Sequence, residues 1–92
     1  MTSCAVPFTN ARARSVGEVD YPDGYHLQEE VTVEVAIAAD GHLDDAWIYA
    51  PSGYQAFDDE ALRVVEASSF VGGTALCQPA PGLYQFIITF SP

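Results

Sequence analysis

The sequence contains no lysine and only three arginines, against thirteen carboxylates, which gives its 92 residues a formal net charge of -10. Nucleic acids and anionic membrane surfaces are held largely by lysine and arginine. Both would repel this chain, so we expect no nucleic-acid partner and no direct membrane binding by this segment. The same acidity favours the solubility of a small domain, and it leaves a basic protein partner open.

The residues that carry most enzyme chemistry are also scarce. The only histidines are His26 and His42, and the two cysteines lack the close spacing of zinc ligands. No glycine-rich loop opens a helix to hold a phosphate, and no GxSxG or HExxH motif occurs. We interpret the acidic triplet Asp58-Asp59-Glu60 as a first helical turn, where the helix dipole favours carboxylates. We therefore expect no enzyme activity, no cofactor and no metal site.

Cys4 and Cys77 lie near opposite ends of the chain. If they form a disulfide, the loop-entropy relation assigns it about 4 kcal/mol, and the domain belongs to an oxidising compartment such as the periplasm. Two free thiols in a cytosolic protein are the alternative. No run approaches the roughly 20 apolar residues of a membrane span, and residues 1–8 do not resemble a signal peptide. Export would therefore depend on a signal or anchor outside this chain.

Residues 31–50 predict a β-hairpin. Branched apolar residues occupy every second position of residues 31–37, as a strand with one buried face requires. Asp40-Gly41 then provides the positive-φ residues of a tight turn. Residues 43–50 predict the returning strand, in which Trp47 and Tyr49 face away from the other apolar side chains.

A helix and a final strand complete the predicted domain. Apolar residues recur at helical spacing between 57 and 70, and Gly72-Gly73 is interpreted as the stop. Residues 83–90 predict an apolar closing strand. Three antiparallel strands with one main helix on one face form a two-layer α+β sandwich of ββαβ order.

Residues 1–30 are the least regular part of the chain, because proline and glycine interrupt any long element. Residues 11–16 have room for one turn of helix. We expect a single domain in which an irregular segment, residues 1–30, packs on a ββαβ unit, residues 31–92. Held by the cysteine link, this segment is expected to cover Trp47 and Tyr49; a contact surface for another molecule is the alternative.

A series of short motifs runs through the chain in a fixed order. They are Tyr21-Pro22, Val31-Val33-Val35, Asp40-Gly41, Ser52-Gly53, Phe57-Asp58, Ala61-Leu62, Phe70 and Phe90. Their order and spacing resemble the C-terminal domain of TonB-family energy transducers over about three quarters of the chain. The sequence departs from that pattern at Ala67-Ser68-Ser69, where basic and aromatic residues are common, and at Gly72, where proline is common.

The resemblance implies a periplasmic protein-binding domain, anchored to the inner membrane by a segment absent from this chain. In such a transducer the final strand lies at a sheet edge and captures an extended peptide of an outer-membrane receptor by strand addition. The residues of this partner-binding edge would be Tyr84, Gln85, Phe86, Ile87, Ile88 and Thr89. The alternative is a structural or accessory cell-envelope module that forms a homodimer or binds another protein through the same sheet.

Overall fold

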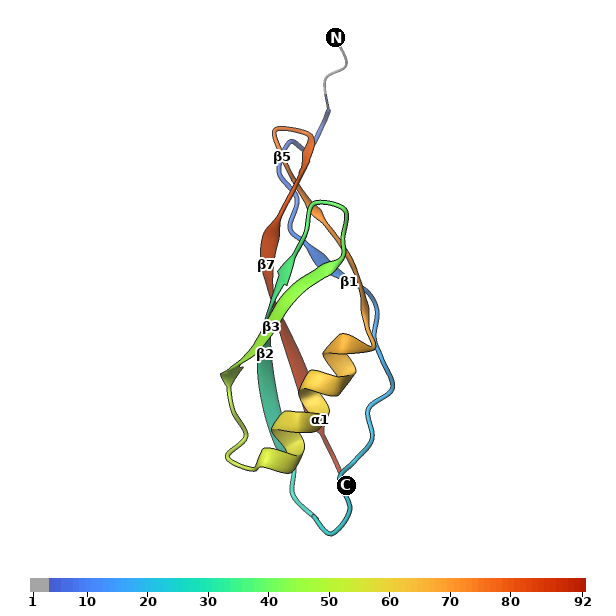
Figure 1. Ribbon diagram of the computed structural model, residues 1–92, viewed down its shortest axis with the longest axis vertical. Helices are drawn as coiled ribbons and strands as arrows, with labels where there is room; N and C mark the ends of the chain where they lie inside the picture. Colours follow the sequence, from blue (N-terminus) through green and yellow to red (C-terminus); the bar gives the residue numbers. More distant parts are fainter. Residues whose placement is uncertain (1–3) are drawn as a thin grey trace.

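The computed structural model describes residues 4–92, an elongated body of 59 × 18 × 17 Å (Figure 1). Its elements are β1 (Arg12–Ser15), β2 (Glu29–Ile37), β3 (Leu43–Ala50), α1 (Gln55–Glu66), β4 (Ser69–Val71), β5 (Gly73–Ala75), β6 (Gln78–Ala80) and β7 (Gly82–Phe90). They form a three-stranded sheet of order β3-β2-β7 and two two-stranded sheets, β1-β4 and β5-β6. All pairings are antiparallel. The predicted α+β class is confirmed.

Strand β2 is the centre of the main sheet. It pairs with β7 along nine consecutive residues, from Glu29 opposite Phe90 to Ile37 opposite Gly82, without a register shift. Its pairing with β3 shifts twice, between Thr32 and Val33 in the middle of β2 and between Ala36 and Ile37 at its end. The sheet is therefore regular on its β7 side and irregular on its β3 side.

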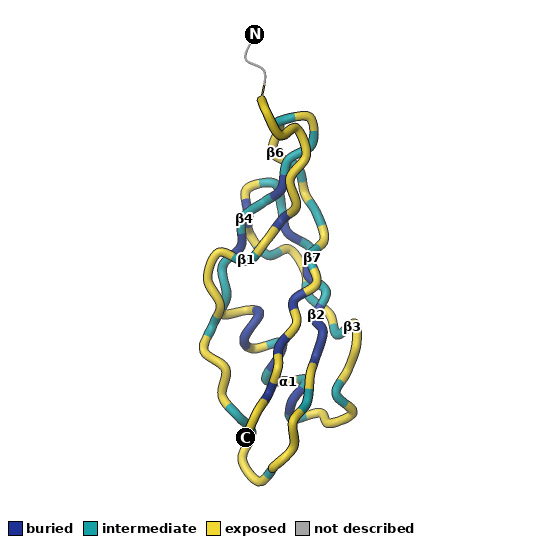
Figure 2. The backbone as a smooth tube through the Cα atoms, turned by 180° about the vertical axis from the view of Figure 1, so that it is seen from behind, coloured by how far each residue is buried: buried dark blue, intermediate teal, exposed yellow. Residues whose placement is uncertain are grey.

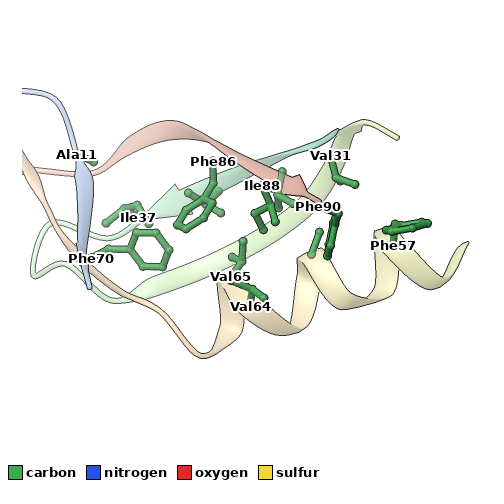
Figure 3. Close-up of a cluster of buried hydrophobic side chains, with 13 residues drawn as sticks. Ala11, Val31, Ile37, Phe57, Val64, Val65, Phe70, Phe86, Ile88 and Phe90 are labelled. Atoms are coloured by element: carbon green, nitrogen blue, oxygen red, sulfur yellow. The ribbon is translucent and has the colours of Figure 1, made fainter. Parts of the chain in front are cut away.

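The core lies between this sheet and α1, as Figure 3 shows. The alternate β2 residues predicted to face the helix are fully buried, and they meet a stripe of the helix and one face of β7. The buried members of these three elements are Val31, Val33, Val35, Ile37, Phe57, Ala61, Val64, Val65, Phe86, Ile88 and Phe90. Burial of this one apolar layer is the main stabilising term for a domain of this size.

The predicted ββαβ unit is only part of the fold, because residues 69–80 form strands in place of a continuing helix and a loop. The helix ends at Glu66, and the Ala67 N–H donates to the carbonyl of Arg63 at 3.0 Å. Gly72-Gly73 is not the helix stop: Gly72 joins β4 to β5, and Gly73 is the first residue of β5. A Cβ atom on Gly72 would lie 2.9 Å from the Ala38 carbonyl oxygen, so close backbone packing explains this glycine.

The N-terminal segment also differs from expectation. Residues 12–15 form β1 and pair with β4, whereas a turn of helix was predicted there. The chain then runs beside α1 (Figure 1), where the Asp20 N–H donates to Glu60 at 2.8 Å. Tyr21 and Tyr25 pack edge-on against the ring of Phe57, with centroids 5.6 and 5.0 Å away. These contacts hold the segment on the helix side of the molecule.

The expected cover over Trp47 and Tyr49 is therefore wrong. These side chains remain 39% and 60% exposed on the sheet face that points away from α1, hereafter the open face. Figure 2 views the molecule from behind, with α1 beyond the strands of the main sheet. The aromatic contacts of Tyr21 and Tyr25 with Phe57 explain the difference, since they draw residues 17–25 to the opposite side.

Candidate protein-binding edge

Strand β7 lies at one edge of the three-stranded sheet. Within residues 4–92 its hydrogen-bonded strand neighbour is β2, and no backbone hydrogen bond reaches it from another segment of that range. The six residues of the predicted edge, 84–89, all lie in β7. We call the side of β7 that points away from β2 the free edge.

The two faces of β7 differ sharply in burial. Phe86, Ile88 and Phe90 point into the core and are 6%, 3% and 1% exposed. On the open face, Leu83 and Ile87 are 61% and 58% exposed. The strand is thus fixed by its inner face, while its outer face and its free edge stay accessible.

Leu83 belongs to this surface although the predicted edge began one residue later. Its alternation with the exposed Ile87 is the signal in the sequence that identifies it.

The free edge lacks the features that normally protect edge strands. Residues 82–90 contain no charged residue and no proline, and their pairing with β2 has no bulge. The opposite edge, β3, carries Asp44 and Asp45 and pairs with two register shifts. Charges and bulges are the usual means of preventing edge-to-edge pairing. Only the β3 edge has them.

Acidic side chains stand beside this edge on the open face. Glu34 of β2 lies opposite Gln85 of β7, and Glu30 lies opposite Thr89. On its other side Glu34 is opposite Trp47 of β3. Glu30 is exposed and Glu34 half-buried. The residues next to β7 therefore give the open face a negative charge.

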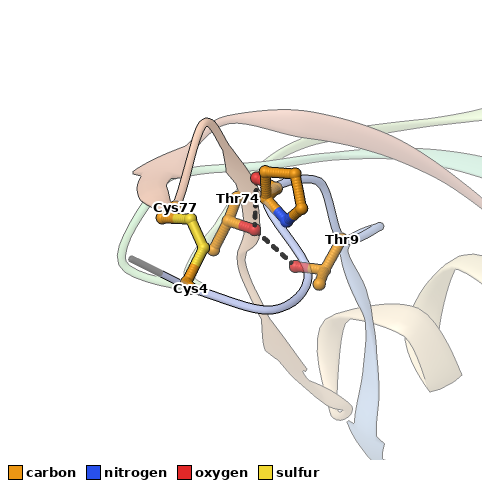
Figure 4. The surroundings of a disulfide bond; sticks show 5 residues. Cys4, Thr9, Thr74 and Cys77 are labelled. Carbon is orange, nitrogen blue, oxygen red and sulfur yellow. Dashed lines mark hydrogen bonds between the residues drawn. A yellow bond between two sulfur atoms is a disulfide. The ribbon is translucent and has the colours of Figure 1, made fainter. Parts of the chain in front are cut away.

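The disulfide between Cys4 and Cys77 is present in the structure, with the two Cα atoms 6.1 Å apart (Figure 4). It joins the N-terminal segment to the turn between β5 and β6. The Cys77 N–H also donates to the Pro7 carbonyl at 2.8 Å. Thr9 and Thr74 exchange two backbone hydrogen bonds of 3.2 and 3.0 Å below it. The cysteines thus close a ribbon at the end of the molecule far from α1.

The acidic triplet was predicted to form the first turn of the helix, but α1 begins at Gln55 and only Asp58 of the three lies in its first turn. Asp58 and Glu60 have structural partners. Asp58 accepts hydrogen bonds of 2.9 Å from the backbone N–H and the hydroxyl of Ser52, which fix the loop after β3. Glu60 accepts two bonds of 2.6 Å from the Arg63 guanidinium. These bonds lower the pKa of the Glu60 carboxyl despite its partial burial. In the described range, 4–92, no three potential metal ligands cluster.

One family model matches the chain, and its description reads Gram-negative bacterial TonB protein C-terminal. The match covers residues 26–92, which include β2, β3, α1 and β7. Neither the curated proteins nor the solved structures contain a significant match. No helix within residues 4–92 has both the length and the apolar character of a membrane span.

Domains of the matched family are periplasmic and interact with proteins, and the family is not one of enzymes. The match extends over most of the chain and contains the whole of the main sheet and its helix. The chain belongs to the family of TonB protein C-terminal domains.

Proposed function

We propose that the free edge of β7 captures an extended peptide of an outer-membrane receptor as a fourth strand of the main sheet. The domain would thereby link the receptor to an energy source at the inner membrane, where a segment outside this chain anchors it. The observation that carries the proposal is the character of β7 as a regular edge strand of nine residues with no charge, proline or bulge. Such an edge is suited to pairing with another chain.

The dimensions of β7 suit this role. At about 3.4 Å per residue, the free edge extends for about 27 Å. In an antiparallel ladder every second residue directs both its N–H and its C=O to the same neighbour. About four residues of β7 thus bond β2, while about four present both groups at the free edge. A peptide of seven to nine residues, by this estimate of roughly 3.4 Å each, would use the whole edge.

The packing of β7 makes it a rigid strand, as a strand that binds a partner requires. Phe90 lies edge-on to Phe57 of α1, with centroids 5.0 Å apart, and Phe86 packs against Phe70 of β4 at 6.1 Å. These buried rings tie β7 to the helix and to the second sheet. Bound peptide would therefore meet a preorganised edge, and preorganisation lowers the ordering cost of binding.

The test is a peptide titration followed by the backbone amide signals of the oxidised protein. We expect an extended peptide with β-branched residues to shift the signals of residues 83–89 and to leave those of β3 in place. Peptides methylated on backbone nitrogens then test strand addition itself. Methylation of every second nitrogen should abolish binding where those N–H groups face β7. Methylation of the other set, whose N–H groups face away from β7, should preserve binding. Absence of shifts in β7, or equal binding by both methylated series, would overturn the proposal.

The competing use of the same edge is pairing with a second copy of this chain, as in an accessory envelope module. Sedimentation over a range of concentrations separates the two. A dimer that dissociates in Ile87→Lys would assign the edge to self-association, because Ile87 is 58% exposed and its substitution leaves the core intact. A monomer that still binds peptide at β7 supports the receptor-binding role.

A further inference from the structure

We infer that the strand captured by β7 is basic, with lysine or arginine at two positions and an apolar residue midway between them, in the pattern basic-x-apolar-x-basic. The inference rests on the proposed function and identifies the kind of peptide that the edge accepts. It follows from the side chains that stand beside the free edge on the open face.

The register of β2 and β7 arranges these side chains in rows across the sheet. Glu34 is in one row with Gln85, and Glu30 is in another with Thr89. A peptide strand beside β7 adds one residue to each row. Since neighbouring strands are about 4.8 Å apart, the Cα of each glutamate lies about 10 Å from that of the peptide residue in its row. A lysine or arginine side chain is long enough to lie along the intervening residue and bring its charge to the carboxylate.

No cation of the described chain neutralises these two carboxylates. None of the ion pairs within residues 4–92 involves Glu30 or Glu34. Arg63 lies on α1 and binds Glu60, and Arg12 and Arg14 lie on β1, outside the main sheet. A basic side chain of a bound peptide would therefore supply the positive charge that Glu30 and Glu34 lack. Like charges placed across neighbouring strands are unfavourable, and opposite charges are favourable.

A surface pocket marks one of the two basic positions. It is lined by Gln28, Glu29, Glu30 and Thr89, at the end of the β7 edge. The pocket adjoins the row of Glu30 and Thr89, where one of the cations of the peptide would lie. Glu29 lies in the next row, opposite Phe90.

The row between the two glutamates explains the apolar position. It contains Thr32, which is 9% exposed, and Ile87, which is 58% exposed. An apolar peptide residue in this row would cover Ile87. The pattern reads the same in both chain directions, so it applies whether the peptide runs parallel or antiparallel to β7.

The experiment uses the full oxidised chain and three peptides with one backbone. They carry arginine, glutamine or glutamate at the two outer positions and isoleucine in the middle. We expect the arginine peptide to bind about fivefold or more tighter than the glutamine peptide, and the glutamate peptide to bind weakest. The difference should narrow as ionic strength rises. Equal affinity of all three peptides at low salt would overturn the inference.

Two protein variants decide whether the local carboxylates or the overall charge cause the preference. The double substitution Glu30→Gln with Glu34→Gln should bring the arginine and glutamine peptides within about twofold of each other. Glu66→Gln changes an exposed carboxylate on α1 and should keep the preference. An equal loss in Glu66→Gln would overturn the register argument. If none of the three peptides shifts β7 signals, the proposed function fails; if all bind at β7 without charge preference, the inference alone fails.

Discussion

Removal of the disulfide should produce a large loss of global stability. The bond joins residues 73 positions apart. The loop-entropy relation gives about 4 kcal/mol for a closed loop of this length at 25 °C. A domain of this size has a total unfolding free energy of about 5–14 kcal/mol. The double variant Cys4→Ser with Cys77→Ser should therefore lose up to about 4 kcal/mol, which is a large part of this total.

The structure also indicates why the measured loss should be at or below this figure. The disulfide closes a ribbon whose remaining ties are the hydrogen bonds of Thr9 with Thr74 and of Cys77 with Pro7. The core around Phe57 lies elsewhere, between α1 and the main sheet. Without the bond, the conformational entropy of the unfolded chain rises, which lowers the stability. The ribbon in the native state also gains entropy, and this gain offsets part of the lost stability.

Urea unfolding, followed by far-UV circular dichroism, measures the effect. At a slope of about 1.2 kcal/mol per molar urea, a loss of 4 kcal/mol lowers the midpoint by about 3 M. Wild-type protein kept reduced is the control and should behave as the serine variant does. Its mass should exceed that of the oxidised protein by two hydrogens. Coincident unfolding curves for the oxidised protein and the variant would refute the reasoning.

Two further predictions concern single positions. Gly72→Ala should cost about 1–3 kcal/mol in a thermal unfolding assay, because its new Cβ would clash with the backbone carbonyls of Ala38 and Ala39. Gly82→Ala, whose Cβ has ordinary contacts, is the matched control and should cost less than about 0.5 kcal/mol. Glu60→Gln should cost about 1 kcal/mol at pH 7. Since Arg63 lowers the pKa of Glu60 in the folded state, its contribution is complete above the unfolded pKa and disappears as pH falls through the folded pKa. The difference from wild type should therefore vanish in acid, and a constant difference would contradict this assignment.

The sequence was sufficient for the parts of the fold that have a strong period. Residues 31–37 and 83–90 alternate, and the structure has strands at both, with the predicted face of residues 31–37 buried. The edge position of β7, which the family resemblance implied, is also found. Binding by this edge stays a prediction, because strand order alone does not identify a partner.

The missed elements depend on contacts between distant residues. Strands of three or four residues, such as β4 and β5, are too short to show a period, and each exists through pairing with a distant or proline-containing segment. Phe70 shows how this misleads: its spacing fits the helix, but it lies in β4 and packs against Phe86. The exposure of Trp47 and Tyr49 also depends on distant contacts. Tyr21 and Tyr25 pack against Phe57 of the helix, which keeps the N-terminal segment away from the open face.

The position of the cystine gives the molecule a direct covalent path for mechanical load. Tension applied ahead of Cys4 passes through the sulfur atoms to Cys77, and from there along β6 into β7. The helix, β1 and the long segment beside α1 lie outside this path (Figure 1). A pull from the N-terminal side would thus reach the closing strand through covalent bonds that bypass the helix.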